Sequence, residues 1–81
     1  MFITLQIKGN KVTLDNVSVG STVFIRVNNS KDMIANDTII SWVTNTFKFS
    51  SSDEVIIKGV RDALLAGFSQ QAKVDREIFV D

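Results

Sequence analysis

The sequence predicts a two-layer α+β fold in which two helices cover one face of an antiparallel sheet. Three observations predict it. Apolar and polar residues alternate, as in strands, over residues 3–14, 22–27 and 74–80. Residues 37–47 and 51–68 instead carry apolar residues three and four apart, as helices do. Each predicted element has one apolar side, so two helices on one side of the sheet would bury all these sides together. The expected order is β-β-β-α-α-β.

A β-hairpin is predicted over residues 3–15. Its apolar residues, which alternate with polar ones, are Ile3, Leu5, Ile7, Val12 and Leu14. Gly9-Asn10 is predicted as the two-residue turn, because glycine adopts the backbone conformations that tight hairpin turns require. This turn would pair Ile7 with Val12 and would leave every apolar side chain on one face.

The third strand is predicted over residues 22–27, antiparallel to the second. Its apolar side consists of Val23, Ile25 and Val27, and its other side of Thr22, Phe24 and Arg26. Residues 28–32 follow as a loop, because Asn, Ser and Asp side chains bond their own backbone in turns.

Composition and pattern disagree over residues 37–47. Ile, Val, Thr, Trp and Phe favour a strand. The spacing favours a helix, with a stripe formed by Ala35, Ile39, Trp42, Val43 and Phe47. Asn36 or Asp37 would cap its start. We predict a helix, because periodicity is the primary signal.

The main helix is predicted from Ser51 towards Gly67. Ser51 would be the N-cap, with Glu54 completing a capping box three residues later. The apolar stripe consists of Ile56, Val60, Ala63, Leu64 and Phe68, and Ile57 and Leu65 widen it. Beyond this helix, residues 73–81 alternate again and are predicted as a final strand or an arm.

We expect residues 1–81 to form a single domain. The composition of this domain restricts the chemistry available to it. The chain has no Cys and no His, so thiolate chemistry is excluded and the commonest general base and metal ligand are missing. Asp75 and Glu77 would share one face of the last strand and could ligate a hard cation such as Mg²⁺, but no third ligand accompanies them. We therefore expect a non-catalytic protein with no cofactor and no metal site.

Lys and Arg balance Asp and Glu at nine each, so the net charge is zero. A nonspecific nucleic-acid binder needs surplus cations to displace counterions, so this balance argues against one. The chain shows no basic, apolar leader and no long apolar run, and we expect a cytoplasmic protein without a membrane span.

A nucleic-acid alternative remains for residues 22–68. Their order of one strand and two helices resembles the ribbon–helix–helix pattern, in which exposed strand residues read base edges in the major groove. The resemblance implies that Thr22, Phe24 and Arg26 would be the reading residues. Bases could also stack on the sheet surface at Phe2 and Phe24.

The favoured hypothesis is binding of another protein, or self-association into a homo-oligomer. Aromatic residues and Arg are enriched at interface centres, so Phe24 and Arg26 on the open sheet face and Phe79 on the tail are the predicted binding residues. The aromatic residues that exceed the needs of a small two-layer core are Phe24, Trp42, Phe47, Phe49 and Phe79. Small, cysteine-free accessory proteins of this kind are frequent in viruses and mobile elements.

Overall fold

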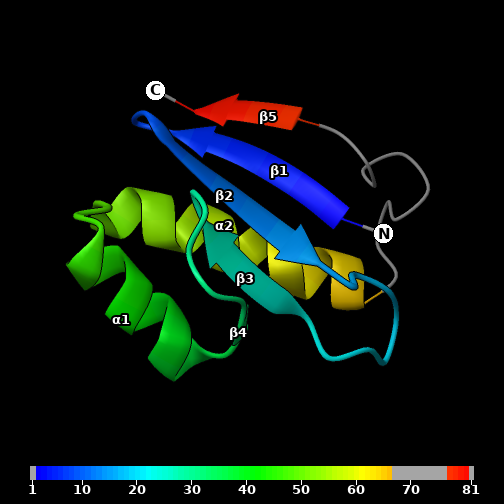
Figure 1. The fold of residues 1–81 in the computed structure, drawn as a ribbon. Coiled ribbons are helices and arrows are strands. Elements are labelled where there is room, and N and C mark those ends of the chain that lie inside the picture. The colour runs from blue at the N-terminus through cyan, green and yellow to red at the C-terminus, as the bar shows by residue number, and fades with distance from the viewer. Residues whose placement is uncertain (1, 67–76, 81) are drawn as a thin grey trace.

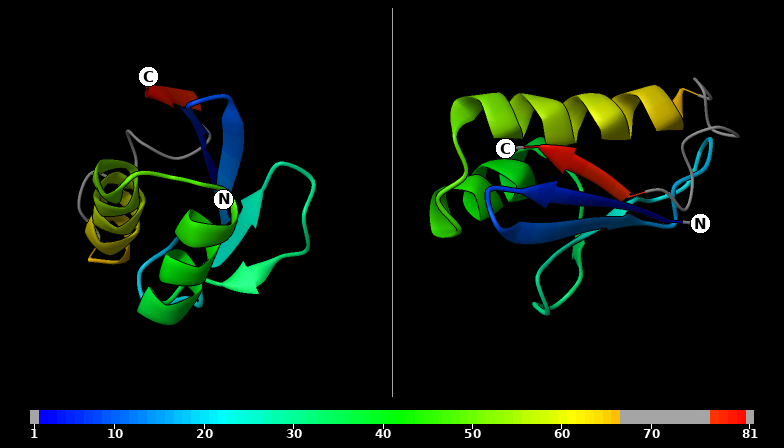
Figure 2. Two further views of the ribbon diagram at one scale, coloured as in Figure 1. Left: turned by 90° about the vertical axis from the view of Figure 1, so that its left-hand side faces the viewer. Right: turned by 90° about the horizontal axis from the view of Figure 1, so that it is seen from above.

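A computed structural model describes residues 2–66 and 77–80 of the chain. Its elements are β1 (Phe2–Ile7), β2 (Asn10–Asp15), β3 (Phe24–Val27), β4 (Met33–Ile34), α1 (Asp37–Thr46), α2 (Ser51–Leu65) and β5 (Glu77–Val80). Both helices lie on one side of the sheet, and the other side is left without a helix (Figures 1 and 2). The predicted α+β class and the two-layer arrangement are confirmed.

The five strands lie in the order β4-β3-β2-β1-β5. The neighbours β1, β2, β3 and β4 are all antiparallel, whereas β5 pairs with β1 in parallel. The expectation that the C-terminal strand would join an antiparallel sheet is therefore wrong in its direction. A parallel neighbour requires a crossover connection, and the intervening strands and both helices supply one between β1 and β5.

The predicted hairpin forms, but its turn lies one residue earlier than expected. Lys8 and Gly9 both have positive φ, 48° and 83°, and Ile7 pairs with Asn10. This combination is the type I′ turn, whose twist matches that of paired strands. The register changes by two residues, so Leu5 pairs with Val12. Because a shift of two preserves the side-chain alternation, the predicted apolar face is retained.

The third strand is shorter than predicted, and it gains a partner that the sequence pattern did not reveal. β3 begins at Phe24 instead of Thr22, whose carbonyl accepts a hydrogen bond from the Asn16 side chain at 3.0 Å. After the loop of residues 28–32, the two residues of β4 pair with β3, placing Ile34 opposite Phe24.

Helix α1 forms where the apolar spacing predicted it. Asn36 is the N-cap and accepts a hydrogen bond from the Ile39 N–H at 2.9 Å. The predicted stripe is confirmed for Val43, which is buried, and for Ala35, Ile39 and Phe47, which pack against the core. Ile40 and Thr44 complete the buried face. Trp42, predicted to be buried, is 50% exposed.

Helix α2 begins one residue earlier than its predicted capping box. Ser50 is the N-cap, and Asp53, not Glu54, is its partner at the third helical position. The Ser50 hydroxyl accepts from the Asp53 N–H, and the Asp53 carboxylate accepts from the Ser50 N–H, each at 3.2 Å. Its buried apolar residues are Ile57 and Leu64, and Val60 and Leu65 pack against the core, so the core face lies within the predicted apolar face.

The core lies between the sheet and the helices. Its buried residues are Ile3, Leu5, Ile7, Val12, Leu14, Val17, Val23, Ile25, Val27, Val43, Phe49, Ile57 and Leu64. Phe49 is buried and Phe47 packs against this cluster, so both belong to the core and not to a surplus of aromatic residues. Within the described part of the chain, neither helix has the length and apolar character needed to cross a bilayer.

Candidate interaction surface

The face of the sheet opposite the helices is here called the open sheet face. The alternation of the strands gives it the side chains of Phe2, Thr4, Gln6, Lys11, Thr13, Asp15, Phe24, Arg26 and Ile34. Neighbouring strands pair antiparallel through these residues, so their relative positions follow from the register. No helix covers this face in Figures 1 and 2.

An apolar row crosses one end of the open sheet face. Ile34 lies opposite Phe24, Phe24 opposite Asp15, and Asp15 opposite Phe2. Phe2 is 46% exposed, Ile34 is 52% exposed and Phe24 is half-buried. We use "apolar row" for Phe2, Phe24 and Ile34. Adjacent strands are about 4.8 Å apart, so this row spans roughly 14 Å across four strands.

An ion pair borders the apolar row. The Arg26 Nε lies 2.5 Å from Asp32 Oδ1, and its Nη2 donates to Asp32 Oδ2 at 3.0 Å. These hydrogen bonds, with the opposite charge, raise the pKa of Arg26 and lower the pKa of Asp32. This bidentate contact holds the Arg26 guanidinium against the loop that precedes β4.

The residues predicted as sites are only partly brought together. Phe24 and Arg26 both lie on the open sheet face, in neighbouring rows. Thr22 is exposed but precedes β3, so it does not continue their line. Phe79 pairs in register with Gln6 at the edge of the sheet, and its side chain lies outside the described part of the structure. Asp75 also lies outside the described residues.

Ile34 is the member of the apolar row that sequence reasoning missed. Its strand is two residues long, too short for any alternation to be visible. The available signal was the turn-forming loop of residues 28–32 directly after β3, because such a loop can return the chain as a hairpin. Phe2, by contrast, was included in the base-stacking alternative.

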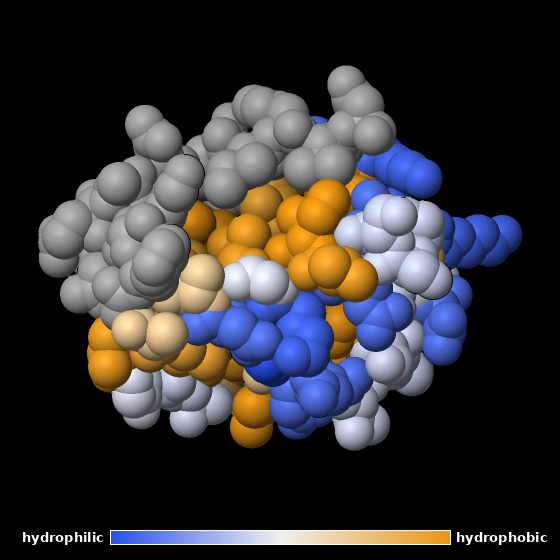
Figure 3. All heavy atoms as spheres, turned by 180° about the vertical axis from the view of Figure 1, so that it is seen from behind, coloured by the Kyte–Doolittle hydropathy of each residue, from blue (hydrophilic) through white to orange (hydrophobic). Residues whose placement is uncertain are grey.

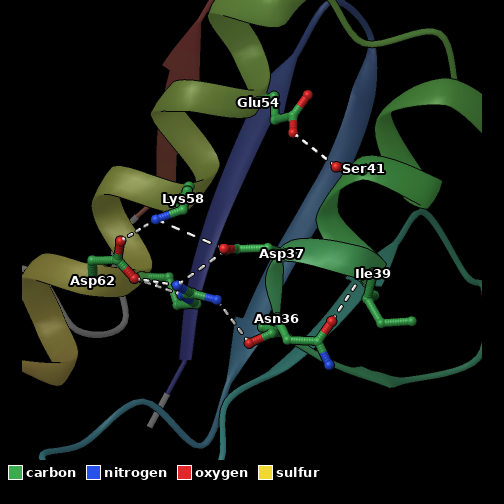
Figure 4. A network of polar contacts seen from close by, with 9 residues as sticks. Asn36, Asp37, Ile39, Ser41, Glu54, Lys58 and Asp62 are labelled. Atoms are coloured by element: carbon green, nitrogen blue, oxygen red, sulfur yellow. Dashed lines mark hydrogen bonds and ion pairs between the residues drawn. The ribbon is translucent and has the colours of Figure 1, made fainter.

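A polar network joins the two helices on the other side of the molecule (Figure 4). Lys58 donates to Asp62 at 2.9 Å and lies 3.8 Å from Asp37. Arg61 pairs with Asp62 and donates to the Ala35 carbonyl at 2.9 Å. The hydrogen bond to Asp62 raises the pKa of Lys58, and the bonds from Lys58 and Arg61 lower the pKa of Asp62. These contacts fix the start of α1 against the middle of α2, which is a structural role.

A second polar contact links the hairpin turn to α2. Lys8 Nζ lies 3.8 Å from Asp53 Oδ2, and the Asp53 side chain is only 3% exposed. Asp53 also accepts the Ser50 hydroxyl hydrogen bond at 2.9 Å. These three contacts satisfy the buried carboxylate of Asp53.

No group of three Asp, Glu, His or Cys residues gathers into a metal-binding cluster within residues 2–66 and 77–80. Comparisons with protein-family models, with curated proteins and with solved structures find no match to this chain. The open sheet face with its apolar row is therefore the candidate that the geometry itself provides.

Proposed function

We propose that this chain is a non-catalytic interaction module that binds another protein through the open sheet face. The observation that carries the proposal is the apolar row, whose members lie on β1, β3 and β4 of the face that no helix covers, with Asp15 of β2 between Phe2 and Phe24. Of the five large, exposed hydrophobic side chains among the described residues, Phe2 and Ile34 lie in this row. Exposed apolar side chains gathered on one face are typical of binding surfaces.

The energetic contribution of the row is moderate. Complete burial of a Phe or Ile side chain is worth about 1.5–3 kcal/mol, and the three members are already partly covered. Their burial in a complex would therefore supply about 3 kcal/mol in total. Association itself costs at least about 4 kcal/mol, so the polar residues around the row must also contribute.

Arg26 and Asp32 provide such a polar border. Both side chains are about 40% exposed, although each is engaged with the other. A partner can thus meet them as a preformed, oriented pair, at a smaller entropic cost than two free side chains would require. Phe24 and Arg26 are accordingly the central binding residues of the proposal, and Phe79 remains a predicted contributor at the sheet edge.

A cytoplasmic location belongs to the same proposal, because a chain without Cys takes no stabilisation from the disulfides of oxidising compartments. We also propose that it serves as an accessory protein of a virus or mobile element. Its small size and limited chemical repertoire are consistent with that setting.

Nucleic-acid binding is the second candidate, favoured by the two aromatic rings of Phe2 and Phe24 on one face. Arg26 is already paired with Asp32, and the chain has no surplus of cations. β3 also lies between β2 and β4, whereas a ribbon–helix–helix dimer needs a free strand edge. A titration with single- and double-stranded DNA and RNA at low salt tests this candidate, and absence of binding there removes it.

The test of the main proposal replaces Phe24 and Ile34 together by Thr. Threonine is β-branched and suits strands, but it removes the aromatic ring at position 24 and shortens the aliphatic chain at position 34. Trp42→Ala is the matched control, because it removes a similarly exposed apolar side chain from α1. Urea unfolding must show that all three proteins are folded before binding is compared.

Immobilised wild-type protein and both variants are then compared for the partners they retain from the native host lysate. We expect the control to retain the same partner as the wild type, and the Phe24/Ile34 variant to lose it by at least tenfold. Equal retention by the Phe24/Ile34 variant, or loss only in the Trp42 variant, would overturn the proposal.

A further inference from the structure

Carboxylate side chains within residues 2–66 are almost all engaged by other side chains. Lys or Arg side chains pair with Asp32, Asp37, Asp53 and Asp62, and the Ser41 and Thr44 hydroxyls donate to Glu54. Asp15 is the exception in this part of the chain. Its carboxylate accepts the N–H of the adjacent Asn16 at 2.7 Å, and no side chain of residues 2–66 bonds to it. Its remaining hydrogen-bonding capacity is therefore available to a partner.

The helical side of the molecule provides the contrast. Figure 3 shows exposed apolar atoms across the middle of that side, with hydrophilic atoms below them. The carboxylates of α1 and α2 are already bonded within the chain, as Figure 4 shows for Glu54 and Asp62. Among the described residues, an unpaired carboxylate beside exposed apolar side chains therefore occurs on the open sheet face and not on the helical side.

Two phenylalanines flank Asp15 on the open sheet face. The register pairs Asp15 with Phe2 of β1 on one side and with Phe24 of β3 on the other. We call these three residues the aromatic–acid site. Phe2 is 46% exposed, and Asp15 and Phe24 are half-buried. Adjacent strands are about 4.8 Å apart, so a group placed over Asp15 lies about 5 Å from the strand that carries each ring.

We propose that the aromatic–acid site binds an arginine side chain of the protein partner. This inference rests on the proposed function, the binding of another protein through the open sheet face, and names the chemistry that the partner presents there. A phenylalanine ring attracts a cation placed over its face within about 6 Å of the ring centre. A guanidinium is planar, so it stacks on a ring and still donates two N–H groups to one carboxylate in a fixed geometry. A lysine ammonium is a point charge without this geometry.

The charges around the site complement a cation. Arg26 is held by both carboxylate oxygens of Asp32. The pKa of Arg26 is raised first by the hydrogen bond and charge of Asp32, and to a smaller extent by the charge of Asp15. Two carboxylates thus lie near one guanidinium, which leaves one negative charge beside the apolar row. Lys11, the only cation of β2, lies four residues from Asp15, a distance of about 14 Å along the strand.

Peptide titration of the full, isotope-labelled chain by NMR tests the proposal directly. The probe is the tripeptide Gly-Arg-Gly with blocked ends, and its control carries citrulline, which has nearly the same shape but no charge. At low salt we expect the arginine peptide to bind with a dissociation constant of about 10 mM, because one exposed ion pair and two ring contacts are each weak. The amide signals of Phe2, Asp15 and Phe24 should shift together. The citrulline peptide should bind about fivefold more weakly, because it lacks the charge.

Asp15→Asn is the central variant. Asparagine keeps an acceptor oxygen for the Asn16 N–H, so the fold should be retained, and the amide spectrum of the variant verifies it. This variant should bind the arginine peptide about fivefold more weakly than the wild type does. Asp37→Asn is the matched control, because it removes a 76% exposed carboxylate from α1, and its affinity should equal that of the wild type. Phe24→Leu keeps an apolar side chain but removes the ring, and it should weaken binding about threefold.

Unchanged affinity in Asp15→Asn, or equal affinities of the wild type for the two peptides, would overturn the arginine site. Shifts centred on the carboxylates of the helices would do the same. Retention of the partner from the host lysate separates this failure from failure of the proposed function. If Asp15→Asn retains the partner fully and the Phe24/Ile34 variant loses it, the open sheet face binds the partner but recognises no arginine. If both variants retain the partner, both proposals fail.

Discussion

The buried carboxylate of Asp53 gives the sharpest prediction about folding. It is 3% exposed and meets three groups: the Ser50 N–H, the Ser50 hydroxyl and the Lys8 ammonium. Asp53→Ala removes the acceptor for all three. We expect this single change to destabilise the protein far more than the loss of an ordinary surface carboxylate.

The magnitude follows from the contacts. Loss of a helix cap costs about 1 kcal/mol, and a hydrogen bond to a charged group is worth about 1.5–3 kcal/mol. The two bonds to Ser50 belong to one capping box, so we expect a combined loss of about 2 kcal/mol. The Lys8 contact adds little, because its distance is 3.8 Å and the Lys8 side chain is 53% exposed. Lys8→Ala should therefore cost less than about 0.5 kcal/mol.

Urea denaturation followed by circular dichroism measures these differences. For a domain of this size the slope is about 1 kcal/mol per molar urea, so Asp53→Ala should lower the midpoint by about 2 M. Asp53→Asn keeps one acceptor oxygen, so its urea midpoint should lie about midway between those of the wild type and Asp53→Ala. The double variant with Ser50→Ala should lose less than the sum of the single losses, because both changes remove the same box. A midpoint shift below about 0.5 M for Asp53→Ala would refute this reasoning. So would a loss of unfolding free energy in Lys8→Ala as large as that in Asp53→Ala.

Three further predictions concern stability. Ile57→Ala, in the core, should lower the unfolding free energy by about 2–5 kcal/mol in urea melts, whereas Val55→Ala on the same helix should change it by less than about 0.5 kcal/mol. Gly9→Ala should cost about 1 kcal/mol by the same assay, because φ is +83° there; no loss would contradict the type I′ turn. The lowered pKa values of Asp32 and Asp62 stabilise the fold above their unfolded values of about 3.9, and this stabilisation is lost as pH falls through the folded values. Melting temperatures between pH 6 and pH 2.5 should therefore fall less steeply when both residues are Asn, and an unchanged slope would contradict the pairing.

The fold was largely predictable because its signals are local and repeated. Alternation identified the strands, and the apolar spacing identified α1 against the strand propensity of its residues. The errors concern details that tertiary contacts decide. The turn at Lys8 and Gly9 requires a non-glycine residue at positive φ, which no sequence pattern indicated. The capping box could start at either of two serines, and the choice of Ser50 follows the burial of Asp53.

The candidate surface was less predictable than the fold. Alternation placed Phe24 and Arg26 on the open face, but it could not show that Asp32 would engage Arg26 across a loop. Ile34 joined the row only through a two-residue strand. Trp42 is the one member of the predicted α1 stripe that is exposed, because Ile40 and Val43 supply the buried side chains at this level of the helix. These outcomes depend on the packing of distant segments, which periodicity within one segment does not encode.

The most direct measurement is a map of the complex between isotope-labelled chain and the captured partner, by NMR chemical-shift perturbation. The account predicts that the largest changes occur at Phe2, Phe24 and Ile34 and at the neighbouring Arg26, while the exposed residues of α1 remain unchanged. Changes confined to the helices, with the sheet residues unaffected, would contradict the claim that the uncovered side of the sheet is the binding surface.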